Sequence, residues 1–231
     1  MIPDYACIRE VASFEELVST PFANGVNAHC WVRSLAGDFN EIVDRLNIHV
    51  EITTLEGEAL QDLKLCDSGK IARDALIEDQ RLLSEFGLSP MLDCIPAYPR
   101  DPDPGTVPTD VYSYHVDSAN AEADTYLCSY NEASSEGLRN EDALRRIDIP
   151  ETRAALLDQY GGKDDTGFLA YLKDNFLDLH YMPILKAKPY TFGLGNLWRI
   201  ATQYPGSPVP PCIHRAPTTS PGRPSRLLLI S

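Results

Sequence analysis

Apolar residues in the first hundred positions recur mostly at helical spacing. Ser13-Phe-Glu-Glu16 has the pattern of a capping box and predicts a short helix. Residues 38–46 and 70–86 carry apolar side chains every three to four positions, and Gly87 with Pro90 supplies a stop after the second run. The pattern therefore predicts that residues 1–108 are mostly a helical support.

The pattern changes after a stretch rich in proline and aspartate at 96–108, which suits neither a helix nor the interior of a sheet. Residues 111–117 and 125–130 are short and rich in Val, Thr and Tyr, and a polar segment at 118–124 separates them. We expect these two segments to be paired strands.

Helical patterning returns between residues 136 and 178. Pro150 suits a first helical turn, Gly161-Gly162 suits a stop, and a second apolar run passes through Phe168 and Phe176. Strand patterns then resume at 180–185, 190–194, 197–201, 209–214 and 226–230. The chain is therefore predicted to be a single, mainly β domain of the α+β class over residues 1–231. It has N-terminal helices and a helical insertion at about 136–178 in a β core that begins at residue 109.

Composition narrows the class of protein. The chain of 231 residues has a formal net charge of −14, which does not suit a broad nucleic-acid surface because phosphate contacts need concentrated Lys and Arg. No apolar run approaches the ~20 residues of a membrane span, and the first residues lack the basic and apolar regions of a secretory signal. The six cysteines form no C-x-x-C pair, which indicates reduced thiols. We expect a cytoplasmic protein that binds neither membrane nor nucleic acid, and the sequence does not determine its oligomeric state.

Two short segments far apart in the sequence carry the residues of a metal centre. His115 and Asp117 stand two positions apart on a predicted strand, so their side chains face one side while Tyr114 and Val116 face the other. His214 lies on a later predicted strand and would approach from another direction. Two imidazoles and one carboxylate on one face of a metal leave three coordination positions open, as in non-haem iron oxygenases. A His-x-Asp pair alone is more often a hydrogen-bonded surface pair, so the prediction depends on all three residues.

An arginine predicted to face the interior is the second candidate feature. Arg226 begins the last predicted strand, whose alternation places Arg226, Leu228 and Ile230 on one face. A guanidinium in the interior needs a partner, and it pairs bidentately with a carboxylate such as that of a dicarboxylic cosubstrate. Arg223 is the nearest alternative, although Pro224 after it favours a turn.

Four further residues are candidates with less specific patterns. His180 also begins an apolar strand and is an alternative to His214 as the third ligand, although no arginine follows it at a comparable strand start. Tyr126 and Tyr130 share one strand face and are candidates to contact the substrate, with a core position as the alternative. Tyr112 is a candidate to contact the cosubstrate, with the same alternative.

Three other polar residues receive structural interpretations. His29 and His49 fall in the region predicted to be helical, where packing is the simpler interpretation. Arg215, next to His214, points to the opposite side of its strand and suits a surface ion pair. None of the three is a candidate ligand.

The order of the candidate residues resembles a known family. His115-Val-Asp117, His214 and Arg226 are similar to the H-x-D…H…R pattern of the iron(II)/2-oxoglutarate-dependent dioxygenases, over roughly residues 110–231. The resemblance implies a double-stranded β-helix, that is, a jelly-roll or cupin-like core. It implies iron(II) held by His115, Asp117 and His214, with the far carboxylate of 2-oxoglutarate on Arg226. It also implies dioxygen as a cosubstrate, and decarboxylation of 2-oxoglutarate to succinate coupled to oxidation of a small-molecule substrate.

A second resemblance is more local. The phrases Tyr126-Leu-Cys-Ser-Tyr130 and Ile213-His-Arg-Ala-Pro217, followed by Arg226-Leu-Leu-Leu, are similar to a bacterial family of uncharacterised function, which implies no substrate. Two alternatives use the same residues. One is a catalytically silent cupin-like module that binds a metal or a ligand, and the other is an interaction protein whose His and Asp residues are structural.

Overall fold

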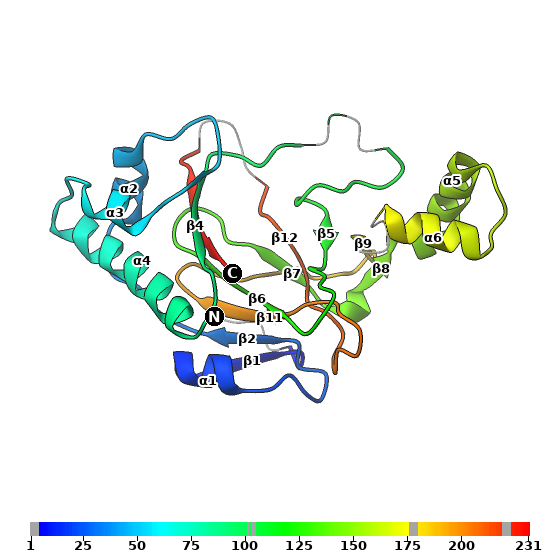
Figure 1. Cartoon of the computed structure of the whole chain (residues 1–231), viewed down its shortest axis with the longest axis horizontal. Helices are drawn as coiled ribbons and strands as arrows, with labels where there is room; N and C mark the ends of the chain where they lie inside the picture. The colour runs from blue at the N-terminus through cyan, green and yellow to red at the C-terminus, as the bar shows by residue number, and fades with distance from the viewer. Residues whose placement is uncertain (1–4, 101, 103–104, 176–179, 219–222) are drawn as a thin grey trace.

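Two β-sheets form the centre of the structure, a computed structural model that describes residues 5–100, 102, 105–175, 180–218 and 223–231 (Figure 1). The seven-stranded sheet consists, in sheet order, of β1 (Ile8–Val11), β2 (Ala28–Trp31), β11 (Leu197–Ala201), β6 (Asp124–Ser129), β13 (Arg226–Ile230), β4 (Met91–Ile95) and β3 (Thr53–Thr54). The six-stranded sheet consists, in sheet order, of β10 (Tyr190–Thr191), β7 (Glu136–Leu138), β12 (Ile213–Arg215), β5 (Tyr114–His115), β9 (His180–Pro183) and β8 (Ala143–Arg145). Neighbouring strands are antiparallel, except that β1 and β2 are parallel. The fold is therefore a mixed α+β structure that is rich in sheet.

Helices lie on both sides of this pair of sheets (Figure 1). They are α1 (Phe14–Ser19), α2 (Phe39–Leu46), α3 (Gly57–Gln61), α4 (Asp67–Glu85), α5 (Pro150–Tyr160) and α6 (Thr166–Asp174), with short 3-10 turns η1 (Asn140–Asp142) and η2 (Arg146–Asp148). The first four pack against the outer face of the seven-stranded sheet. Helices α5 and α6 pack on each other around Phe168 and lie beyond β8 in Figure 1.

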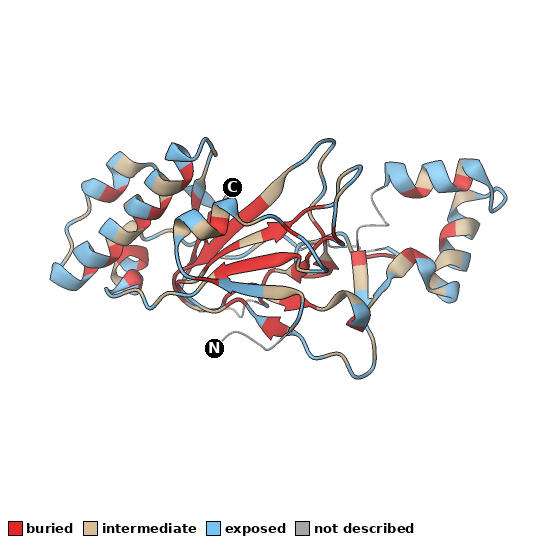
Figure 2. Cartoon of the chain, turned by 90° about the horizontal axis from the view of Figure 1, so that it is seen from below, coloured by how far each residue is buried: buried red, intermediate tan, exposed pale blue. Residues whose placement is uncertain are grey.

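Helix α4 illustrates how spacing determines which face is buried. Ala72, Leu76 and Leu83 recur at intervals of four and seven residues and are fully buried. They pack in one cluster with Leu227 and Leu229, which face outward from the seven-stranded sheet. Figure 2 shows buried residues along the inner faces of the helices and through the strands.

A second core lies between the two sheets. Trp198 and Leu228 of the seven-stranded sheet belong to one buried cluster with Tyr190 and Cys212 from the side of the six-stranded sheet. Phe192 stacks on Trp198 with ring centroids 4.4 Å apart, and its carbonyl accepts a hydrogen bond of 2.8 Å from the indole nitrogen. The sheets therefore face each other across a packed interior.

The predicted helix signals are confirmed. The hydroxyl of Ser13 accepts a hydrogen bond of 3.1 Å from the Glu16 amide, and the Glu16 carboxylate accepts one of 2.8 Å from the Ala12 amide. Gly87 follows α4 with a φ of 92°, a left-handed conformation that glycine adopts without a steric cost. Both runs predicted at 38–46 and 70–86 are helices, which begin at Phe39 and Asp67.

The prediction that residues 1–108 are mostly helical is wrong in one respect. This region also supplies β1, β2, β3 and β4, four of the seven strands of one sheet. Each strand has at most five residues, and the two pairs β1–β2 and β3–β4 join the sheet through distant strands, β11 beside β2 and β13 beside β4. Such short strands carry little periodicity of their own, so tertiary pairing decides them.

The prediction that residues 111–117 and 125–130 pair is also wrong. β5 lies in the six-stranded sheet between β12 and β9, whereas β6 lies in the seven-stranded sheet between β11 and β13. The connection at 118–124 therefore passes from one sheet to the other. Sequence adjacency predicts a hairpin because consecutive strands often pair, but here a mostly exposed connection leads from one sheet to the other.

The helical insertion is shorter than predicted. Its helices span residues 150–174, and Pro150 and Gly161 begin and end α5 as expected. Residues 136–145 instead contain β7 and β8 of the six-stranded sheet, and Phe176 lies outside the described residues. The strands predicted at 197–201 and 226–230 are confirmed at both ends.

Two expectations from composition can be compared with the structure. All six cysteines are free thiols in this structure, and four of them are buried. Within the described part of the chain, no helix combines the length and apolarity needed to cross a membrane.

His29 is a buried imidazole in the seven-stranded sheet, on β2 and not on a helix as predicted. Its side chain is fully buried and stacks on Phe22 with ring centroids 4.7 Å apart. Neither ring nitrogen has a hydrogen-bond partner among the described residues. Burial, followed by the positive charges of Arg199 and Arg9, lowers the pKa of His29 from 6.5 to about 4, against the opposing effect of Glu16. The folded protein therefore holds His29 neutral at neutral pH.

We expect His29 to make the free energy of unfolding depend on pH. Between pH 6.5 and about 4 the unfolded chain binds a proton that the folded chain does not bind, so stability falls as the pH drops through this window. The stabilisation is complete above the unfolded pKa, and its loss amounts to about 3 kcal/mol at the lower end. Urea unfolding of wild type and His29→Phe at pH 7.5, 6, 5 and 4.5 measures the effect. Because other buried groups titrate in both proteins, the difference between the two slopes reports His29, and equal slopes would contradict the assignment.

Candidate metal centre

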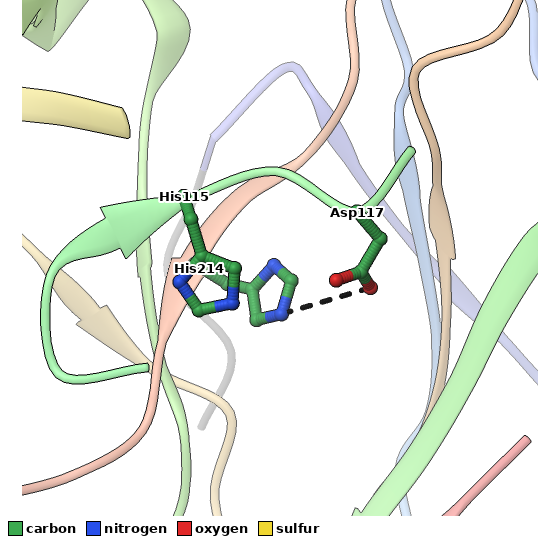
Figure 3. A group of neighbouring side chains, drawn as sticks. All are labelled: His115, Asp117 and His214. Atoms are coloured by element: carbon green, nitrogen blue, oxygen red, sulfur yellow. Dashed lines mark ion pairs between the residues drawn. The ribbon is translucent and has the colours of Figure 1, made fainter. Parts of the chain in front are cut away.

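Three side chains from sequence-distant segments converge between the sheets. His115 on β5 stands directly opposite His214 on β12, and their rings are 4.6 Å apart between centroids. The Asp117 carboxylate lies 3.8 Å from Nε2 of His214 (Figure 3). One ligand atom from each residue lies within 4.8 Å of the other two. Ligand atoms on one face of an ion are about 3 Å apart at ordinary bond lengths, so small side-chain rotations bring these three onto one ion.

Neighbouring groups orient the three donors. Nδ1 of His115 lies 2.8 Å from the Ser113 carbonyl, and Nδ1 of His214 lies 3.4 Å from the Cys212 carbonyl. Protonated at Nδ1, each imidazole donates to its carbonyl and leaves the Nε2 lone pair available for a metal. The Thr125 hydroxyl donates a hydrogen bond of 2.6 Å to Oδ2 of Asp117. Such outer partners are what fix the tautomer and direction of metal ligands.

The electrostatics place His115 and Asp117 in the protonation states that metal binding requires. Burial, reinforced by the nearby His214, lowers the pKa of His115 to about 4. Burial raises the pKa of Asp117, but the His214 imidazole and the hydrogen bond from Thr125 outweigh it and leave that pKa below its usual value. At neutral pH His115 is neutral and Asp117 is ionised. The cluster of His115, Asp117 and His214 can therefore hold a metal ion.

The local backbone differs from the predicted strand. β5 contains only Tyr114 and His115, so Asp117 follows the strand, where its carbonyl accepts a hydrogen bond of 2.7 Å from the Gln203 amide. The predicted facing still holds, because Tyr114 and Val116 pack in a separate apolar cluster on the other side. The bond to Gln203 ties the segment that carries Asp117 to the chain just after β11, a strand of the other sheet.

A cavity of about 230 Å³ joins the metal centre to the last strand. Its lining comes from both sheets and consists of Asp93, Tyr98, Val111, His115, Asp117, Leu127, Ser135, His214, Ala216, Arg226, Leu228 and Ile230. Arg226, Leu228 and Ile230 share this face of β13, which confirms the predicted alternation.

Arg226 is a buried cation in this cavity, and no described residue gives it an anionic partner. Its residue is 3% exposed, and its Nη2 donates hydrogen bonds of 2.8 and 2.9 Å to the hydroxyls of Ser129 and Ser135. Its Nε has no partner, and no carboxylate of the described residues forms an ion pair with it. Burial lowers the pKa of Arg226, against the opposing effect of Tyr98. A guanidinium in this state is suited to receive a carboxylate from a ligand.

The alternative arginine lies elsewhere. The side chain of Arg223 is 71% exposed and lies 3.6 Å from the Glu132 carboxylate. It lines a neighbouring cavity of about 430 Å³, which Arg226 also borders but the three metal donors do not. Arg226 is therefore the arginine that shares a cavity with the metal centre.

The tyrosines predicted to contact ligands are placed in the core. Tyr126 and Tyr130 are buried among the helices on the outer face of β6, and the Tyr130 hydroxyl donates to Asp79. The prediction that they line the substrate pocket is wrong, because β6 turns Leu127 and not these tyrosines toward the cavity. Tyr112 is buried with its hydroxyl 3.1 Å from the Tyr98 amide, and it is not part of the cavity lining.

Two polar residues near the centre take other positions. His180 is directly opposite His115 on β9 with a ring separation of 6.0 Å, yet it lies outside the group of three donors. Arg215 forms an ion pair of 2.6 Å with Glu136, which confirms the predicted interpretation.

Sequence reasoning missed several residues of the cavity. Asp93 lies on β4, a strand that the pattern did not predict, and Tyr98 lies in the proline-rich stretch. Ser129 does not line the cavity but accepts a hydrogen bond from Arg226, and alternation along β6 places it on the same face as Leu127. Ser135 carries no local signal, since only the folded chain brings it to Arg226.

Comparison with protein-family models, with curated proteins and with solved structures finds no match to this chain.

Proposed function

We propose that this chain is an iron(II)- and 2-oxoglutarate-dependent oxygenase that oxidises a small molecule. The observation that carries the proposal is the presence, in one cavity, of a His-Asp-His donor set and a buried arginine that forms no ion pair with any described residue. The first suits a metal and the second suits a carboxylate. A cosubstrate with a metal-chelating end and a distant carboxylate satisfies both.

The fold is consistent with this proposal. Two mainly antiparallel sheets face each other, and the donors lie between them. This arrangement supports a double-stranded β-helix core, with α1 to α4 packed on its outer side. In double-sheet folds of this kind the space between the sheets is the natural place for a ligand.

The donor set favours iron(II) among common metals. Two imidazoles and one carboxylate with open positions are typical of non-haem iron oxygenases, whereas thiolates would favour zinc. None of the six cysteines belongs to the group of donors. Bound iron would supply activation of dioxygen and oxidation of the cosubstrate and substrate.

The chain itself would bind and orient the cosubstrate. Arg226 would hold the far carboxylate of 2-oxoglutarate, and the hydroxyls of Ser129 and Ser135 keep its guanidinium in place. Leu127, Leu228 and the rest of the apolar wall would exclude water from the reacting end.

Arg226→Ala is expected to weaken the binding of the cosubstrate and to leave the binding of the metal unchanged. Iron(II) should stabilise this variant as it stabilises wild type, because all three donors remain. The affinity for 2-oxoglutarate should fall about 30-fold or more, since the carboxylate loses a buried charge partner. Thermal melting with iron, with and without 2-oxoglutarate under anaerobic conditions, measures both effects.

Arg223→Ala is the matched control and should keep the response to 2-oxoglutarate. Loss of the response in Arg223→Ala but not in Arg226→Ala would move the cosubstrate to the neighbouring cavity. Succinate release from 2-oxoglutarate under air then separates an oxygenase from a silent module that binds the same ligands. Binding of both ligands without succinate, in the presence of a broad panel of small molecules, would favour the silent module.

A further inference from the structure

The carboxylate of Asp93 lines the cavity, does not belong to the group of metal donors and forms no ion pair with Arg226. It stands opposite Leu228 in the pairing of β4 with β13, and it lines the cavity with that residue. Its Oδ1 accepts a hydrogen bond of 2.6 Å from the Thr54 hydroxyl, which orients the side chain. No Lys, Arg or His of the described residues forms an ion pair with it. The cavity therefore offers a second unpaired charge, opposite in sign to Arg226.

The position of Asp93 separates it from the cosubstrate end. Arg226 pairs with Ile95, two residues along β4 from Asp93, so the two side chains stand about 7 Å apart along one face of the sheet. The wall near Asp93 is apolar and includes Leu127, Leu228 and Ile230. A ligand there meets one anionic group and a hydrocarbon surface.

The charges of the filled cavity indicate what this ligand must carry. A divalent metal and Arg226 contribute three positive charges, while Asp117, Asp93 and a dicarboxylate cosubstrate contribute four negative ones. The filled site thus has one negative charge in excess, and Asp93 is the carboxylate of the cavity to which neither the metal nor Arg226 has been assigned. An unpaired charge in a partly buried site is costly, so a cationic ligand is favoured over a neutral or anionic one.

We infer that the oxidised substrate is a small aliphatic amine whose ammonium group binds Asp93 and whose hydrocarbon chain lies along the apolar wall. This inference rests on the proposed function, because the charge count includes the metal and the cosubstrate. Asp93 is a specificity-determining residue in this view and takes no part in holding the metal.

The test uses three four-carbon probes, n-butylammonium, n-butanol and butyrate. Each is titrated by calorimetry into the full chain loaded with iron(II) and 2-oxoglutarate without oxygen. Wild type should bind n-butylammonium at least tenfold more tightly than n-butanol and should bind butyrate most weakly. Asp93→Asn should remove the preference for the ammonium over the alcohol while leaving the affinities for iron and 2-oxoglutarate within twofold of wild type. Asp44→Asn, the same change at an exposed position of α2, should alter none of these values.

The outcomes separate this inference from the proposed function. Equal binding of the ammonium and the alcohol by wild type, or an unchanged preference in Asp93→Asn, would overturn the inference even if iron and 2-oxoglutarate bind. Failure of iron or 2-oxoglutarate to bind would instead overturn the proposed function, and titration of the probes into the unloaded chain would then decide the role of Asp93. Thr54→Val serves as a second variant, because loss of the orienting hydroxyl should reduce the ammonium preference without removing the charge.

Discussion

His214→Ala is expected to abolish stabilisation of the protein by iron(II), whereas His180→Ala is expected to retain it. Both imidazoles are 8% exposed and lie on strands that flank β5, so the two substitutions are matched in burial and in chemistry. Only His214 brings a ring nitrogen into the group formed with His115 and Asp117. The comparison therefore tests which histidine completes the metal centre.

The expected size follows from mass action. Iron at a hundredfold its dissociation constant stabilises the folded state by about 2.7 kcal/mol, which raises the melting temperature by about 5 to 10 °C in a chain of this length. Anaerobic thermal melting with increasing iron(II) should show this rise in wild type and His180→Ala, and none in His214→Ala. Succinate release should fall to the background rate in His214→Ala alone. A rise in His214→Ala together with its loss in His180→Ala would assign the third ligand to β9.

Asp79→Ala is expected to cause a large loss of stability, because it breaks a buried ion pair. The Asp79 carboxylate on α4 accepts hydrogen bonds from both terminal nitrogens of Arg33, at 2.5 and 2.8 Å, and one of 2.7 Å from the Tyr130 hydroxyl. The side chains of Arg33 and Asp79 are 9% and 3% exposed. The Arg33 Nε also donates to the Gly195 carbonyl at 2.9 Å. The network ties the longest helix to the seven-stranded sheet and to the segment before β11.

Removal of the carboxylate leaves the Arg33 charge and the Tyr130 hydroxyl buried without their partner. We expect the free energy of unfolding to fall by about 3 to 5 kcal/mol. Asp74→Ala on the same helix, where the side chain is 66% exposed, should change it by less than about 0.5 kcal/mol.

Equilibrium urea unfolding monitored by circular dichroism measures the Asp79 effect. The double variant Arg33→Met with Asp79→Leu should recover most of the lost stability, because it removes both charges together. A double variant that is no more stable than Asp79→Ala would show that shape, and not the unpaired charge, determines the cost.

The parts of the fold that could be predicted are those with local causes. The capping box at Ser13 and the stop at Gly87 depend on hydrogen bonds and backbone angles within a few residues, and both occur as predicted. The alternation of Arg226 and Leu227 along β13 follows from the two-residue period of a strand. These features need no knowledge of the rest of the chain.

Sheet membership could not be predicted in the same way. β5 and β6 are neighbours in sequence but lie in different sheets, and β2 pairs with β11 across more than half of the chain. A strand of two to six residues has open hydrogen-bonding groups on both edges, and its own sequence does not select which strand fills them. For the same reason the sequence pattern does not predict β4, and it therefore does not indicate Asp93 as a residue of the cavity.

The candidate site also has features that the sequence predicts and features that only the tertiary structure decides. The sequence contains the types of residue that can bind a metal. It also contains His115, Asp117, His214 and Arg226 in an order that predicts a metal centre. The cavity is a property of the tertiary structure, which adds Ser135 to Arg226 and turns Tyr126 away into the core. The sequence determined which chemical groups are available and which way each one faces along its own strand, because those depend on covalent spacing. Only the tertiary structure decided which groups meet, because contacts between distant strands depend on how two sheets pack and not on the neighbours of any residue in the chain.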